Sequence, residues 1–123
     1  MESRFKFRAW DKENKKYIYG VEKGLEFYST AGNLRVMTLA EIAESSKYNL
    51  EQCTGLKDKK GKLIYEGDIV EVPVLYNGIP TGKKQRCKVY YKHGAFNIYA
   101  VKSEYLKIVG NIHENPELLE EHK

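Results

Sequence analysis

The segment from residue 53 to residue 70 constrains the fold most, because three glycines recur in it at six-residue spacing. Gly55, Gly61 and Gly67 each permit a positive φ angle, and the apolar-rich run from Ile69 to Leu75 follows the last of them. The segment therefore predicts a tight turn, a short hairpin and entry into a strand. It contains no catalytic constellation, so it constrains the fold and leaves the activity open.

Short segments of β-prone residues, separated by turn residues, follow one another along most of the chain. Pro73 lacks an N–H donor and predicts an edge or a bulge in its strand, and Asn77-Gly78 is a turn signal within an expected mobile loop. The predicted extended elements are a hairpin over residues 4–20, strands 25–29, 34–37, 68–75, 85–91 and 105–112, and a segment 95–101 that returns from a turn at His93-Gly94; residues 76–82 form the loop. This pattern predicts a mainly β, β-rich α+β protein with a small sandwich or barrel.

Two helices are predicted from their start signals. Thr38 and Glu41 fit a capping box, which begins a short helix that ends near Ser45. Near the C-terminus, Asn115 is a good N-cap and Pro116 suits the first helical position of a short terminal helix.

The net charge of +4 is unevenly distributed. Residues 1–55 carry 9 basic and 8 acidic side chains, residues 56–112 carry 11 and 5, and residues 113–123 carry 1 and 4. The excess of positive charge thus belongs to the glycine-rich hairpin and the strands after it. A solvated lysine-rich surface accounts for this distribution, and an anionic partner is the alternative.

No pattern of metal-binding or catalytic residues is recognisable. The three histidines are dispersed, Cys53 and Cys87 are far apart and expected to be reduced thiols, and no phosphate-binding loop or nucleophile elbow occurs. Gly55 to Lys62 has one residue too many for a phosphate loop, and Leu63 replaces the Ser or Thr that would bind magnesium. We therefore expect no cofactor, no metal, no small-molecule substrate and no enzymatic activity.

Tyrosine is unusually frequent, with ten in 123 residues, and several lie beside lysines in the predicted strands. Three explanations are open: tyrosine covers a sheet well, it is enriched at protein interfaces, and it stacks on the bases of single-stranded nucleic acid. The candidate contact residues are Tyr17, Tyr19, Lys83, Lys84, Arg86, Lys88, Tyr90 and Lys92.

Three blocks of sequence resemble one known family. They are Arg4-Phe5-Lys6-Phe7-Arg8-Ala9-Trp10-Asp11, the glycine-rich block from Thr54 to Val70, and Ile108-Val109-Gly110-Asn111-Ile112-His113-Glu114-Asn115-Pro116-Glu117-Leu118-Leu119. In this order they resemble the YopX family, small proteins encoded by bacteriophages and prophages. The resemblance implies an N-terminal β region with a short helix over residues 1–54 and an SH3-like barrel with a C-terminal tail over residues 55–123. It implies no catalytic residue, because the family has no established activity.

These observations predict a non-enzymatic phage or prophage accessory protein in the bacterial host cytoplasm. We expect it to act through contacts with a protein partner or with copies of itself. The alternative is a nucleic-acid-binding module of phage DNA or RNA metabolism. No run of 18 apolar residues and no secretory h-region is present, so no membrane association is expected.

Overall fold

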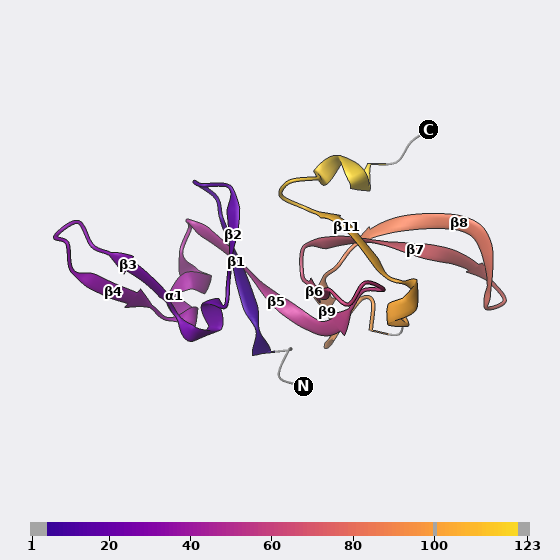
Figure 1. Ribbon diagram of the computed structural model, residues 1–123, viewed down its shortest axis with the longest axis horizontal. Helices are drawn as coiled ribbons and strands as arrows, with labels where there is room; N and C mark the ends of the chain where they lie inside the picture. The colour runs from indigo at the N-terminus through magenta and orange to yellow at the C-terminus, as the bar shows by residue number, and fades with distance from the viewer. Residues whose placement is uncertain (1–4, 100, 121–123) are drawn as a thin grey trace. The chain divides into compact units, whose positions relative to one another are not determined.

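The computed structural model describes residues 5–99 and 101–120, and it is mainly β (Figure 1). The chain divides into two compact units, one up to Cys53 and one from Thr54 onward. A mainly β fold was predicted from the sequence and is confirmed. Arg4, at the start of the predicted first hairpin, and Ala100, within the predicted 95–101 segment, lie outside the described residues.

The first unit is built on the predicted N-terminal hairpin. Strand β1 (Phe7–Asp11) pairs antiparallel with β2 (Lys16–Tyr19), and on its other side with the first residues of β5 (Tyr48–Lys57). Asp11 holds the turn after β1, because its Oδ1 accepts backbone N–H groups from Glu13 and Asn14, each at 3.0 Å. The Asn14 backbone and side chain lead the interactions that hold the pKa of Asp11 below its ordinary value.

The predicted strands over residues 25–29 and 34–37 and the first predicted helix are also confirmed. Strands β3 (Leu25–Tyr28) and β4 (Leu34–Met37) pair antiparallel, and helix α1 (Leu39–Glu44) follows them. Thr38 Oγ1 accepts the Glu41 N–H at 3.2 Å, and Glu41 Oε1 accepts the Thr38 N–H at 2.8 Å, which completes the capping box. A short 3₁₀ turn, η2 (Val21–Lys23), links β2 to β3.

The core of the first unit joins β1, η2 and α1. Ala9, Val21 and Ile42 are buried there, and partly buried apolar side chains from strands β1 to β5 and from α1 surround them. The residues around this core are Phe7, Ile18, Leu25, Met37, Leu39, Tyr48 and Leu50.

Strand β5 corrects one prediction. The sequence predicts a turn at Gly55, but Gly55 lies inside the ten-residue β5 with a φ of 83°. The strand continues into the second unit, where its neighbour is β6 (Leu63–Tyr65) and where buried Thr54 donates its hydroxyl to the Ile64 carbonyl at 2.8 Å. A strand with a positive-φ glycine bends locally, so glycine here permits a bend rather than a reversal.

Two buried aspartates hold the loops of the glycine-rich segment. Asp58 Oδ1 accepts the N–H groups of Lys60 and Lys62 at 2.9 and 3.0 Å, and its Oδ2 accepts that of Ile108 at 3.2 Å. Asp68 Oδ2 accepts the Tyr65 N–H at 2.8 Å at the start of β7 (Asp68–Tyr76). Burial opposes the ionised form of Asp58 and raises its pKa, but the three N–H donors outweigh this and the net pKa is lowered.

Strand β8 (Ile79–Lys88) corrects the predicted loop over residues 76–82. It pairs along its length with β7, and the turn between them is only Asn77-Gly78, whose φ angles of 52° and 79° suit a two-residue hairpin loop. The register shifts between Pro73 and Leu75, so the predicted irregularity at Pro73 is confirmed. The predicted strand 85–91 in fact starts earlier and ends at Lys88, so Tyr91 belongs to the next strand.

The last third of the chain has shorter elements than predicted. Strands β9 (Tyr91–Lys92) and β10 (Ala95–Phe96) flank the predicted His93-Gly94 turn, and the chain leaves the extended conformation after Phe96 rather than continuing to residue 101. After the 3₁₀ turn η3 (Ser103–Tyr105), β11 (Lys107–Asn111) pairs with β7. The terminal helix is one 3₁₀ turn, η4 (Pro116–Leu119), with Pro116 at its first position.

Asn115 does not cap that turn, contrary to the prediction. Its Oδ1 instead accepts the Asn111 N–H at 3.2 Å, and it lies where a Cβ on Gly110 would be. The side chain is therefore used to close the loop after β11.

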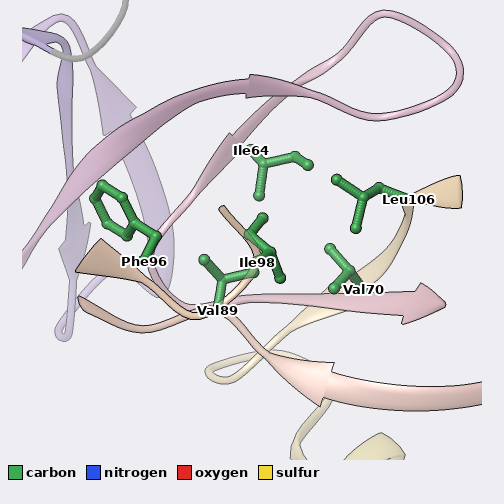
Figure 2. Close-up of a cluster of buried hydrophobic side chains, with 6 residues drawn as sticks. All are labelled: Ile64, Val70, Val89, Phe96, Ile98 and Leu106. Carbon is green, nitrogen blue, oxygen red and sulfur yellow. The ribbon is translucent and has the colours of Figure 1, made fainter. Parts of the chain in front are cut away.

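The core of the second unit gathers side chains from strands and from the turns between them (Figure 2). Its six buried residues come from β6, β7, the end of β8, β10 and the approaches to β11. They are Ile64, Val70, Val89, Phe96, Ile98 and Leu106. This core fixes the base of the β7–β8 hairpin, whose distal end extends beyond the other strands of the unit (Figure 1).

Candidate contact surfaces

Tyr17 is part of a packed cluster in the first unit. The Arg8 guanidinium carbon lies 3.9 Å from the centre of the Tyr17 ring, and the Trp10 ring meets Tyr17 edge-on with 4.9 Å between centroids. Arg8 Nε donates to Glu51 Oε1 at 2.8 Å, and both of these side chains are buried. The cluster gives Tyr17 a structural role, whereas Tyr19 beside it is 55 % exposed.

The six other candidate residues lie in the second unit, so no single unit carries all eight. Tyr90 and Lys92 are exposed, and Asn97 Oδ1 accepts the Tyr90 N–H at 2.9 Å and thereby fixes the backbone there. The remaining four are exposed basic residues on β8, namely Lys83, Lys84, Arg86 and Lys88.

Three of these basic residues share one face of β8. Lys84, Arg86 and Lys88 alternate along the strand, opposite Pro73, Glu71 and Ile69 of β7. Glu71 is the shared acidic neighbour, with its carboxylate oxygens 3.8 Å from Lys84 Nζ and 3.9 Å from Arg86 Nε. Separations of this length between half-exposed groups contribute little to stability, so the basic face stays available for other contacts.

The distal part of the β3–β4 hairpin is an apolar surface that was missed at the sequence level. Tyr28 pairs with Leu34 and Glu26 pairs with Val36, so these four residues share one face. Tyr28 is 74 % exposed, and Leu34 and Val36 are each 54 % exposed. In the described part of the chain, no third strand pairs with this hairpin. The signal in the sequence was the alternation of apolar and polar residues in two neighbouring strands, with no further apolar strand nearby to cover their exposed face.

The tip of the β7–β8 hairpin is a second apolar surface that was missed. Leu75, Tyr76 and Ile79 are 47 %, 72 % and 67 % exposed around the Asn77-Gly78 turn. A predicted mobile loop gave no reason to expect it. Because β8 is a strand paired with β7, these residues lie at fixed positions on the two faces of the hairpin end.

A hollow of about 680 Å³ lies between β8 and η4 in the second unit. Its walls mix charged and apolar side chains, with no pairing of a nucleophile and a base. The lining residues are Glu71, Lys84, Gln85, Arg86, Leu118, Leu119 and Glu120. Cys87 is half-buried on the opposite face of β8, and burial raises the pKa of its thiol, which disfavours the reactive thiolate.

The described residues form neither a cluster of metal ligands nor a membrane-spanning helix. Among residues 5–99 and 101–120, no three His, Cys, Asp or Glu side chains gather closely enough to hold a metal ion. None of the helices in that same part of the chain is long and apolar enough to cross a bilayer.

One family model matches most of the chain. The family model described as YopX protein matches residues 6–120. Protein EF1440 from Enterococcus faecalis is similar in structure with a TM-score of 0.60 and 26 % sequence identity, covering 94 % of this chain and 97 % of that one. Protein yopX from Bacillus subtilis shares the fold with a TM-score of 0.59 and 19 % identity, covering 96 % and 98 %. No curated protein matches. The chain belongs to the YopX family.

Proposed function

We propose that this protein is a non-enzymatic phage or prophage protein that acts by contact, and that it first associates with a second copy of itself through the β3–β4 hairpin. The exposed apolar face formed by Tyr28, Leu34 and Val36 carries this proposal. Its resemblance to the phage and prophage proteins of the YopX family supports the origin and a site of action in the host cytoplasm.

A two-stranded hairpin gains stability when a further strand or layer covers its apolar face. Within the described residues, this hairpin is anchored at its base, where Leu25 and Met37 pack on the core of the first unit. Beyond the base, both outer edges of the hairpin lack a partner strand in the described part of the chain. A second hairpin related by a twofold axis would supply both a pairing edge and an apolar face.

The use of the buried acids supports a role without catalysis. Asp58 and Asp68 are among the most buried acidic residues, and their oxygens accept backbone N–H groups that hold loops in place. These carboxylates act as structural groups, so they offer no general base to a substrate.

Light scattering coupled to size-exclusion chromatography tests the association. We expect a mass near twice 14.3 kDa at high protein concentration, falling on dilution. Each strand of the hairpin has only four residues, whereas a stable interface uses roughly 20–30 residues a side, so the dimer should dissociate readily.

The matched variants are Leu34→Asp, on the apolar face, and Arg35→Ser, the next residue on the opposite face. Leu34→Asp should give a monomer at every concentration, and Arg35→Ser should behave as the unaltered chain. A monomeric unaltered protein at high concentration, or equal loss of association in both variants, would overturn the proposal.

A further inference from the structure

The end of the β7–β8 hairpin is apolar on both faces. Tyr76 and Ile79 are cross-strand partners on one face, and Leu75 and Pro80 are partners on the other. Each of these residues is exposed, and the hairpin end extends beyond the other strands of its unit (Figure 1). A two-sided apolar end suits insertion into a slot, because a surface laid flat against a partner would cover only one face.

The flanks of this end carry mainly positive charge, and Glu71 is the acidic neighbour across the strand pair. Residues 72–88 contain four basic side chains and no acidic one. Within the described residues, Lys83 and Lys88 form no ion pair, while Lys84 and Arg86 have only the long contacts to Glu71 across the strand pair. The partner of this hairpin should therefore be a polyanion.

A hollow of about 200 Å³ beside the same hairpin, lined by both Pro73 and Pro80, brings further lysines close to it. Lys59 and Lys107 line it together with Lys84, and two carboxylates, of Glu71 and Glu104, lie on its walls. The lysines come from three separate parts of the second unit, which the fold brings together beside the hairpin.

We propose that the β7–β8 hairpin binds double-stranded DNA, with its apolar end in the minor groove and its basic residues on the phosphates. Apolar side chains that enter the minor groove wedge between base steps, while Lys and Arg beside them contact the backbone. With the hairpin lying lengthwise along the groove, residues 84 to 88 would cover about 13 Å of strand, which equals the axial length of about four base pairs. This surface lies in a different unit from the β3–β4 hairpin, so it does not depend on self-association.

Fluorescence anisotropy with a labelled DNA duplex of about two helical turns tests the proposal. If all four basic residues contact phosphates, the slope of log affinity against log salt is about −3.6, and affinity falls about 150-fold between roughly 50 and 200 mM salt. Lys83→Ala/Lys88→Ala should halve that slope, so the same change of salt weakens binding only about 12-fold. Tyr76→Ser/Ile79→Ser should weaken binding about tenfold with no change in slope, because apolar contacts release no counterions.

The matched control is Lys12→Ala/Lys16→Ala, which removes the same charge from exposed residues of the first unit. It should leave both affinity and slope unchanged. Circular dichroism of each variant checks that the strands persist. Three results would overturn the proposal: no duplex binding at low salt, equal weakening by the control pair, or tighter binding to the matching single strand. Binding to vesicles containing phosphatidylserine without binding to the duplex would assign the hairpin to a lipid surface instead, and would also overturn it.

Discussion

The buried ion pair between Arg8 and Glu51 should be essential to the first unit. Replacing Glu51 by Gln keeps the side-chain shape and removes the charge that Arg8 Nε meets at 2.8 Å. Removing one partner of a buried pair costs about 3–5 kcal/mol. We expect about 3 kcal/mol, the lower end, because the Tyr17 ring remains 3.9 Å from the guanidinium and still attracts it.

Trp10 makes this loss measurable. It is the only tryptophan, it is 7 % exposed, and its ring lies against Tyr17 within the same cluster. Its fluorescence therefore follows the unfolding of the first unit in urea. With an m value of about 2 kcal/mol per molar, a loss of 3 kcal/mol lowers the urea midpoint by about 1.5 M.

Two further variants separate charge from shape. Arg8→Met/Glu51→Leu removes both charges and should recover much of the lost stability, because an apolar pair of similar volume often replaces a buried ion pair without cost. Glu13→Ala breaks an exposed pair with Lys47 at 3.6 Å and should change the midpoint hardly at all. The reasoning is refuted if Glu51→Gln unfolds at the same urea concentration as the unaltered protein.

Three more predictions concern single side chains. Asp58→Asn should cost about 2 kcal/mol in urea unfolding, since one amide oxygen replaces a carboxylate that accepts three N–H groups. Because the folded-state pKa of Asp58 is lowered, its contribution is complete above the unfolded value of about 3.9 and is lost as the pH falls through the lower folded value; acid titration of the Asn variant should lack that loss. Gly110→Ala should cost about 1–3 kcal/mol, because its Cβ would lie 2.6 Å from Asn115 Oδ1 and 2.9 Å from Asn115 Cβ; adding Asn115→Gly should relieve the clash, and thermal unfolding that shows no relief would contradict this. Alkylation at neutral pH should be slow at Cys87, whose pKa is raised by burial, and should reach Cys53 only on unfolding; rapid labelling of either native thiol would show the burial to be wrong.

Local signals in the sequence predicted the elements that local chemistry determines. The capping box of Thr38 and Glu41, the turns at Asn77-Gly78 and His93-Gly94, and the irregularity at Pro73 all occur where expected. Each depends on a few neighbouring residues, whose side chains or φ preferences are sufficient to decide the backbone.

Elements whose backbone is decided by pairing with another strand, or by a competing hydrogen bond, were missed or misplaced. Residues 79–82 contain Pro80 and Gly82 and favour a loop by composition, but pairing with β7 makes them part of β8, and Thr81 Oγ1 anchors them by donating to the Val74 carbonyl at 2.8 Å. Gly55 likewise belongs to a strand because β5 pairs there with β6. Asn115 has the chemistry of an N-cap, but its side-chain oxygen accepts the Asn111 N–H instead of an N–H of the 3₁₀ turn.

The candidate contact residues show the same division. Composition identified the exposed basic residues of β8, but it could not distinguish Tyr17, packed on Arg8 and Trp10, from exposed Tyr19. The apolar faces of the two hairpins emerged only from the strand registers. Closure of the second unit into an SH3-like barrel stays a prediction from the family resemblance.

Hydrogen–deuterium exchange at two protein concentrations tests the proposed association most directly. If copies of this chain join through the β3–β4 hairpin, the amides of Leu25–Tyr28 and Leu34–Met37 should exchange more slowly in concentrated protein, while the amides of β1 and β2 keep the same rates. Identical exchange of the β3–β4 amides at both concentrations, in a sample whose mass shows association, would place the interface elsewhere and contradict the account.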